Sequence, residues 1–193
     1  MARTKEFDRD VVIDRAMELF WLRGYEATSL QDLVEHMGIG RGSLYATFGD
    51  KHRLYLAALD RYAERTSARM HALLERSESA RAALEQIFGS IVDDAMSRPQ
   101  RRGCLLTNTT VELVPHDPAM AEKVAASRAA TEAAFRGALV RAQARGELAA
   151  RHDPRALARF LVSSVVGLYV SAKAGAGRAE LEDVVRVVLD ALD

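Results

Sequence analysis

Apolar residues recur at the three- and four-residue spacing of an α-helix along most of the chain. In the first segment they share one face, at Val12, Ala16, Leu19 and Phe20. In the last segment they follow the spacing i, i+3, i+4, i+7, i+8, i+11, at Leu181, Val184, Val185, Val188, Leu189 and Leu192. Alternation with a period of two, which is typical of β-strands, is absent from the sequence. The pattern therefore predicts an all-α protein of about nine helices.

Capping residues indicate where the short N-terminal helices begin and end. Ser29 is a good N-cap for a short helix that ends at Gly38, and Asp32 completes a looser form of the capping box. A second short helix is predicted over residues 41–48. Asp50 then caps a long helix that reaches into the seventies.

Two aspartate–proline pairs predict the starts of two long helices, over about residues 118–146 and 154–175. In each pair the aspartate is suited to the N-cap. The proline takes the first helical position, where its missing N–H has no intrahelical partner to lose. The pairs are Asp117–Pro118 and Asp153–Pro154.

The short N-terminal helices and the longer helices that follow suggest two functional units. We place the boundary inside the long helix that begins near Asp50, which gives units of residues 1–53 and 54–193. Because the two units share a helix, we expect no flexible linker between them.

Composition excludes several classes of protein. Lys plus Arg and Asp plus Glu both number 27, so the overall charge does not indicate a nucleic-acid partner. The single cysteine excludes a disulfide framework and a cysteine-based zinc site. The five histidines are scattered, and no pair has the i, i+4 helical spacing of a metal site. We therefore expect neither a metal nor a cofactor.

The sequence does not predict a membrane protein. The N-terminal residues, MARTKEFDRD, lack an apolar signal region, which predicts a cytoplasmic protein with a reduced thiol. The longest apolar run, residues 160–172, contains two serines and is followed by Lys173. A run of this length is too short to span a bilayer.

Residues 29–48 predict two short helices joined at a tight turn, which is the outline of a helix-turn-helix. One helix of such a pair can present its exposed face to the DNA major groove. The exposed positions on the second helix are Arg41, Ser43, Tyr45 and Thr47. An arginine can donate two hydrogen bonds to a guanine edge, and hydroxyl groups suit phosphates or bases.

Local charge supports this interpretation where overall charge does not. Between Gly38 and Arg53 the only acid is Asp50, against the bases Arg41, Lys51 and Arg53. Lys51, His52 and Arg53 begin the next helix, within reach of a DNA backbone, and the N-terminal tail adds Arg3 and Lys5. The alternative is that Tyr45 and Phe48 are simply core aromatics of a helix pair that never binds DNA.

Short motifs follow one another through this region: Gly24–Tyr25, Ala27–Thr28–Ser29–Leu30, Asp32–Leu33, Met37–Gly38–Ile39, Arg41–Gly42–Ser43–Leu44–Tyr45, Phe48 and Asp50–Lys51. Together they resemble the N-terminal domain of the TetR family of transcriptional regulators. The resemblance implies a homodimeric DNA-binding protein, usually a repressor, whose variable C-terminal domain binds a small inducer. One departure is Gly40, where the family commonly has a capping serine or threonine.

The resemblance also implies roles for individual residues. Thr28, Tyr45 and Lys51 match positions that contact phosphates, and Arg41, Gly42 and Ser43 match positions that face bases. Together with the exposed positions above, the residues expected to bind double-stranded operator DNA are Thr28, Ser29, Arg41, Gly42, Ser43, Tyr45, Thr47, Lys51 and His52.

The last two predicted helices are apolar on more than one face, so they are expected to be buried against another surface. Pairing with the same helices of a second copy would form a four-helix bundle with isologous contacts. A homodimer of this kind would set two recognition helices one DNA turn apart and predicts a palindromic operator. The alternative is that these helices form the core of a monomer.

The helices between about residues 55 and 148 mix apolar and scattered polar side chains, a lining suited to a small, mostly apolar ligand. Plain packing explains the same pattern. The candidate ligand-binding residues are Ile87, Phe88, Ile91, Met96, Cys104, Leu105, Asn108, Thr109, Phe135 and Leu139.

Cys104 is expected to open a helix, after an arginine-rich stretch that contains Arg98, Pro99, Arg101 and Arg102. A helix N-terminus and nearby guanidinium groups both favour the reactive thiolate. Cys104, its neighbours and Lys173 also resemble a TetR-type repressor that responds to N-ethylmaleimide and reactive chlorine, in which a cysteine paired with a lysine is the sensor. The sequence leaves open whether Cys104 is a sensor of this kind or a small buried packing residue.

Two further classes remain as alternatives. Cys104, His116 and Asp117 are residue types found in thiol-dependent acyl transfer, but no oxyanion-stabilising loop accompanies them, so we do not expect an enzyme. A helical ligand carrier without DNA binding would share the ligand site but leave the local positive charge without a purpose.

Overall fold

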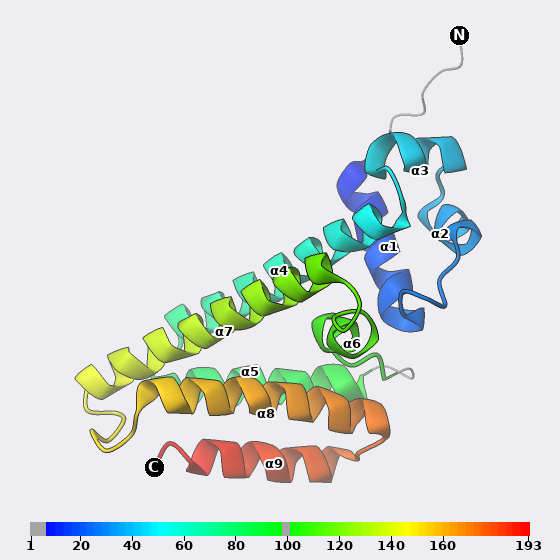
Figure 1. Ribbon diagram of the computed structural model, residues 1–193. Helices are drawn as coiled ribbons and strands as arrows, with labels where there is room; N and C mark the ends of the chain where they lie inside the picture. The colour runs from blue at the N-terminus through cyan, green and yellow to red at the C-terminus, as the bar shows by residue number, and fades with distance from the viewer. Residues whose placement is uncertain (1–6, 98–100) are drawn as a thin grey trace.

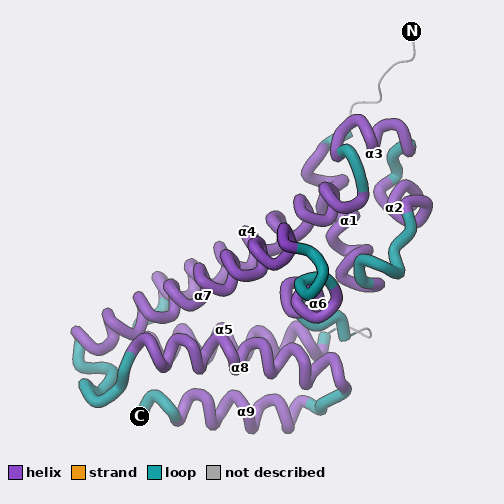
Figure 2. Tube along the Cα trace, viewed as in Figure 1, coloured by secondary structure: helices purple, strands orange, loops and turns teal. Residues whose placement is uncertain are grey.

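The computed structural model describes residues 7–97 and 101–193. Within these residues the regular structure consists of nine helices and contains no strand (Figure 1; Figure 2). The helices are α1 (Arg9–Arg23), α2 (Leu30–Met37), α3 (Arg41–Phe48), α4 (Lys51–Arg76), α5 (Ala80–Met96), α6 (Leu105–Glu112), α7 (Pro118–Ala144), α8 (Pro154–Ala174) and α9 (Arg178–Asp190). The all-α prediction is confirmed. Arg3, Lys5, Arg98 and Pro99, which were considered above, lie outside the described residues.

The predicted caps are present. Ser29 and Asp32 form the capping box of α2, and the Asp50 carboxylate accepts a hydrogen bond from the Arg53 amide at the start of α4. Asp117 and Asp153 cap α7 and α8, each followed by its proline in the first turn. The helices begin where these residues predict, and α7 and α8 end within two residues of the expected positions.

The short helices α1, α2 and α3 gather at one end of the molecule (Figure 1). Helices α4 and α7 run side by side away from this end, and α5, α8 and α9 form a layer beneath them (Figure 1). Helix α6 lies between the two groups, next to α1 (Figure 1). The N-terminal group and the C-terminal layer are therefore connected through α4, α6 and α7.

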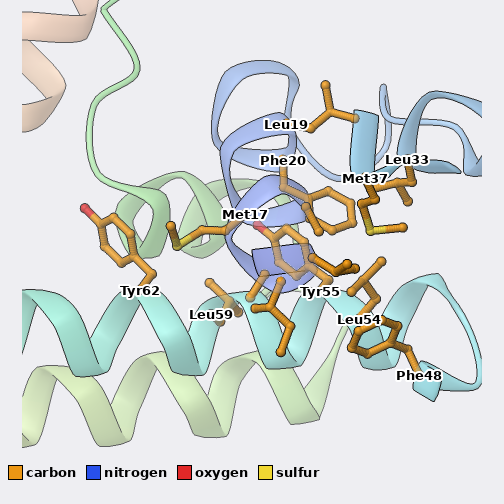
Figure 3. Packing of buried hydrophobic residues seen from close by; sticks show 14 of the residues in the cluster. Met17, Leu19, Phe20, Leu33, Met37, Phe48, Leu54, Tyr55, Leu59 and Tyr62 are labelled. Atoms are coloured by element: carbon orange, nitrogen blue, oxygen red, sulfur yellow. The ribbon is translucent and has the colours of Figure 1, made fainter. Parts of the chain in front are cut away.

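The buried side chains form two clusters. The first joins α1, α2, α3 and the beginning of α4, and also includes Leu105, Leu113 and Met120 from the C-terminal part. Figure 3 shows Phe20 and Tyr55 next to each other in this cluster, with Tyr62 at its edge. The second joins α5, α7, α8 and α9. Buried residues on both sides of position 53/54 share the first cluster, so the proposed domain boundary is not a break in packing.

Helix α8 extends beyond the apolar run of residues 160–172. It continues for 21 residues, and by length and composition alone it is long enough and apolar enough to cross a membrane. A single helix of this kind is weak evidence for a membrane span. In this fold α8 packs against α5, α7 and α9.

Candidate DNA-binding surface and ligand cavity

The turn between α2 and α3 sets the orientation of α3. Gly38 ends α2 in the left-handed region, at φ 71°, where an L side chain would be strained. Leu44 and Phe48 face the N-terminal core and are buried, which leaves the opposite face of α3 free. We call this the outer face of α3: Arg41, Gly42, Ser43, Tyr45 and Thr47. Ser43 is half-buried and the other four are exposed.

The start of α2 is held by charge as well as by the capping box. Asp32 accepts hydrogen bonds from the Ser29 amide at 2.9 Å and from Arg23 Nη1 at 2.8 Å. The hydrogen bonds from Ser29, and then that from Arg23, lower the pKa of Asp32 to about 2. Gly40 is the N-cap of α3. Because glycine has no side chain, α3 begins without a side-chain cap hydrogen bond. Ser29 is exposed at the edge of this surface.

The Thr28 side chain lies inside the protein and not on the surface. Its side chain is 0% exposed, and its hydroxyl donates a 2.6 Å hydrogen bond to the Gly24 carbonyl oxygen. The Thr28 amide donates to the Tyr25 carbonyl oxygen at 3.2 Å. Both donors of Thr28 therefore hold the loop between α1 and α2, and burial keeps the side chain from a DNA phosphate in this conformation.

The two basic candidates at the start of α4 have different surroundings. Lys51 Nζ lies 4.2 Å from the centre of the Tyr25 ring, in a cation–π contact at the edge of the N-terminal unit. His52 Nε2 lies 2.7 Å from Asp117 Oδ2, at the start of α7. Burial raises the pKa of Asp117, but hydrogen bonds from the Met120 amide and His52 outweigh this and lower it. His52 therefore connects the N-terminal unit to α7, a role that the sequence did not indicate.

Helix α6 also makes polar contacts with the N-terminal core. The Glu112 carboxylate, at its end, accepts hydrogen bonds from the backbone amides of Tyr25 at 3.1 Å and Glu26 at 2.8 Å. Tyr55 and Thr109 hydroxyls are 2.8 Å apart inside the core, and burial raises the pKa of Tyr55 to about 12. The sequence pattern does not indicate these contacts, because the residues come from distant segments.

The loop before α6 is attached to α1. Trp21 Nε1 donates a 2.9 Å hydrogen bond to the Gly103 carbonyl oxygen, and the Arg102 guanidinium lies 5.8 Å from the centre of the Trp21 ring. Next to this contact, Asn108 donates to the Arg102 carbonyl oxygen and accepts from Lys173 Nζ at 2.8 Å. Residues 101–104 are thereby held between α1 and α8.

A cavity of about 650 Å³ lies behind this loop. Its walls come from α1, α4, α5, α6, α7, α8 and residues 101–104. Four of the ten predicted ligand-binding residues line it: Ile87, Ile91, Cys104 and Phe135. A second, more open groove of about 640 Å³ lies between α4 and α7 and contains none of the predicted residues.

The other six predicted ligand-binding residues do not line the cavity. Phe88 and Leu139 belong to the C-terminal core, and Met96 packs against it. Leu105 and Thr109 are buried in the N-terminal core, and Asn108 holds the loop as described above. Lining residues that the sequence analysis missed include Trp21, Tyr62, Arg102 and Tyr169. The helical pattern marks a side chain as inward-facing but does not distinguish core from cavity.

Cys104 occupies the N-cap of α6 and is half-buried. Its thiol faces Tyr62, whose pKa is raised well above the usual range by burial and then by Cys104. Lys173 lies against Gly103, next to Cys104 in the chain, and its amino group is bonded to Asn108. The structure therefore brings Cys104, Tyr62 and Lys173 into one neighbourhood beside the cavity.

Helices α8 and α9 present large apolar side chains to the surface. At least two-fifths of each of these side chains is exposed: Phe160, Val166, Val170, Val184 and Val187. We call this set the apolar face of α8 and α9. Across residues 7–97 and 101–193, no group of three or more His, Cys, Asp or Glu residues could hold a metal ion.

Comparison with known proteins identifies the class of protein. Residues 12–58 match the family described as bacterial regulatory proteins, tetR family. Residues 80–188, more than half of the chain, match the Tetracyclin repressor-like, C-terminal domain. The chain belongs to the TetR family of DNA-binding transcriptional regulators and is not an enzyme.

Individual relatives agree over the whole length. The uncharacterized HTH-type transcriptional regulator YezE of Bacillus subtilis (strain 168) is 42% identical over all of both chains. The HTH-type transcriptional repressor ComR of Escherichia coli (strain K12) is 38% identical, over 97% of this chain and 90% of its own. A cysteine mutant of the TetR family transcriptional regulator CifR, complexed with 26-bp double-strand operator DNA, is 35% identical. It superposes with a TM-score of 0.88 over 99% of this chain and 100% of its own.

Proposed function

We propose that this regulator is a homodimeric repressor that leaves a palindromic operator when a small ligand occupies the cavity. The observation that supports ligand control most directly is the position of the cavity, whose walls include Trp21 of α1 and the loop that holds it. ComR is a repressor and CifR binds operator DNA, which supports the same roles here. We infer that the protein acts in the cytoplasm, where such an operator is found.

The outer face of α3 is proposed to enter the major groove, with Arg41, Gly42 and Ser43 towards the bases. Exposure of Arg41 and Tyr45 on the side away from the core supports this orientation. Tyr45, Thr47, Ser29 and Lys51 are proposed to meet the sugar–phosphate backbone, which fixes the position of a protein on a duplex. Because of its pairing with Asp117, His52 is proposed to connect the two units and not to bind DNA.

The apolar face of α8 and α9 is proposed as the dimer interface. A patch of this kind on a small protein is typical of an association surface. Pairing with its own copy would place α8 and α9 of both chains in one four-helix bundle and satisfy the symmetry of a two-fold operator.

Ligand and DNA are proposed to oppose each other through α1 and α6. Helix α1 belongs to the N-terminal unit and α6 contacts it, and both helices border the cavity or its loop. A ligand that prefers an arrangement unsuited to DNA must lower operator affinity by the same factor by which DNA lowers ligand affinity.

Replacing Lys51 with alanine tests the DNA-binding surface. We expect affinity for any duplex to fall, and the slope of log K against log salt to decrease by about one unit, because one phosphate contact is lost. The measurement is fluorescence anisotropy on labelled DNA from immediately upstream of the gene, at several salt concentrations. Arg155→Ala is the matched control, because Arg155 is an exposed base at the start of α8, away from the N-terminal unit. An unchanged slope in Lys51→Ala would show that Lys51 does not contact a DNA phosphate.

A thiol sensor is a second candidate, favoured by the position of Cys104 at an N-cap beside the cavity and next to Tyr62. An electrophile or oxidant that modifies the thiol would place new bulk or charge beside the loop that holds α1. We expect N-ethylmaleimide or hypochlorite to weaken DNA binding of the native protein and to leave Cys104→Ser unaffected. If both proteins are equally sensitive, or equally insensitive, the sensor role of Cys104 is excluded.

If the protein binds no DNA at any salt concentration, the result favours a ligand carrier without DNA binding.

A further inference from the structure

The cavity has two kinds of wall. One is apolar and contains Ile87, Ile91, Phe135 and Val165. Elsewhere on the lining are four guanidinium groups, those of Arg65, Arg69, Arg101 and Arg102. A mostly apolar ligand, which the sequence predicts, accounts for the first wall and leaves the second unexplained.

Three of these arginines already have partners. Arg65 pairs with Asp14 at 3.2 Å, and Arg69 pairs with Asp94 at 3.1 Å. Arg101 donates to two carbonyl oxygens at the end of α8, at 3.2 and 2.6 Å. The protein itself therefore supplies a counter-ion or hydrogen-bond acceptors for each of these three guanidinium groups.

Arg102 differs from the other three. Among the described residues its side chain forms no ion pair and no hydrogen bond, and its Nε is buried without an acceptor. Its guanidinium makes a cation–π contact with Trp21. A guanidinium keeps its charge at any ordinary pH, and a buried donor without an acceptor is costly. The guanidinium group lines the cavity without a counter-ion among the described residues, so an anion in the cavity would balance its charge and accept hydrogen bonds from it.

We propose that the cavity binds an amphiphilic carboxylate, with the carboxylate on Arg102 and the hydrocarbon chain along Ile87, Ile91 and Phe135. The planar guanidinium suits a carboxylate, because the two can form parallel hydrogen bonds. Of the acids on the lining, Asp94 is paired with Arg69, and Glu18 and Glu64 are exposed to water. This inference rests on the proposed function, in which the cavity is the ligand site.

The position of Arg102 gives such a ligand a direct route to the DNA-binding unit. The guanidinium lies over Trp21 of α1, and the next residue, Gly103, accepts the Trp21 indole hydrogen bond. A carboxylate bound to Arg102 competes with the indole ring for the same cation. Binding therefore alters the contact that holds residues 101–104 against α1.

The chain contains a single tryptophan, so its fluorescence reports directly on this contact. We would titrate the full-length protein, without DNA, with sodium decanoate and with decanol, which has the same chain length and no charge. Both are kept below the concentrations at which they aggregate. We expect decanoate to change the Trp21 emission saturably. Decanol should bind at least about tenfold more weakly, because a hydrogen bond between charged groups is stronger than one to a neutral hydroxyl by the free energy that corresponds to a tenfold change in Kd.

Variants then assign the effect to one side chain. Arg102→Gln should bind decanoate at least about tenfold more weakly, and Arg102→Lys should fall between, because it keeps the charge without the planar fork. Arg136→Gln is the matched control, because Arg136 is exposed on α7 and is not among the lining residues. Isothermal titration calorimetry repeats each comparison, because removal of Arg102 itself alters the Trp21 emission. Circular dichroism verifies that each variant is folded.

Three results would overturn the proposal: equal affinities for decanol and decanoate, native affinity in Arg102→Gln, or no binding of decanoate by either method. The result is separate from the regulator proposal. If decanoate binds through Arg102 but leaves operator affinity unchanged, the carboxylate site stands and ligand control of DNA binding through it fails.

Discussion

Charged residues on the apolar face of α8 and α9 should separate the dimer and abolish tight operator binding. In the double variant Val170→Glu, Val187→Glu, we expect a monomer at micromolar concentration and operator affinity lower by about a hundredfold or more. These side chains are 50% and 58% exposed in the isolated chain, so the substitutions cost the monomer little. In a dimer, the same positions would bury unpaired carboxylates against each other.

Sedimentation equilibrium measures the assembly state, and anisotropy on the same operator measures the affinity. The matched control is Val111→Glu, Val140→Glu, because these valines are 77% and 51% exposed but lie on α6 and α7. We expect the control to remain a dimer. A double variant on α8 and α9 that still sediments as a dimer would show that the interface lies elsewhere.

Phe20→Ala should remove a large part of the stability of the N-terminal unit. Phe20 is 0% exposed, and its ring lies 4.7 Å from that of Tyr55 and 6.1 Å from that of Tyr25, measured between centroids. Truncating a buried phenylalanine costs about 3–5 kcal/mol, from the lost burial and the cavity that remains. The free energy of unfolding of a native domain is only about 5–15 kcal/mol in total. The variant should therefore lose DNA binding well below the unfolding temperature of the native protein.

Urea unfolding, followed by the fluorescence of the neighbouring Trp21, measures the change in the free energy of unfolding. Protein concentration is held constant, because association adds to apparent stability. Leu22→Ala serves as the control, because Leu22 is on the same helix but 40% exposed, and we expect a change of about 0.5 kcal/mol or less. A loss below about 1 kcal/mol in Phe20→Ala would contradict the central position of this ring.

The contacts of α6 and its preceding loop give a physical route between the proposed ligand site and the proposed DNA-binding surface. Glu112 holds the backbone that leads into α2, and Gly103 holds Trp21 of α1. Under the proposed function, a ligand that displaces residues 101–104 would move groups that position the helix-turn-helix. The long helix α4, which belongs to both units, provides a parallel connection, and the Arg61–Asp14 ion pair at 3.0 Å attaches it to α1. Arg61 holds the pKa of Asp14 below its usual range, so this connection is present at neutral pH.

The sequence alone determined the helices and the outer face of α3. Caps such as Ser29, Asp50 and Asp117 are local signals, because the side chain bonds the backbone two or three residues away. The outer face of α3 was predictable for the same reason, since one helix of eight residues places Arg41 and Tyr45 opposite Leu44 and Phe48. Local spacing is enough where all the participating residues lie on one or two adjacent helices.

The cavity was decided by the tertiary structure. Its apolar residues show the same helical spacing as core residues, so Ile87 and Phe88 could not be told apart until the neighbouring helices were in place. Thr28 matches a family motif, yet its burial against Gly24 depends on how the loop folds back on α1. The partnerships of Arg102 with Trp21, His52 with Asp117 and Glu112 with Tyr25 join residues 65 or more positions apart. Such pairs leave no periodic pattern in the sequence, because only the packing of whole helices brings them together.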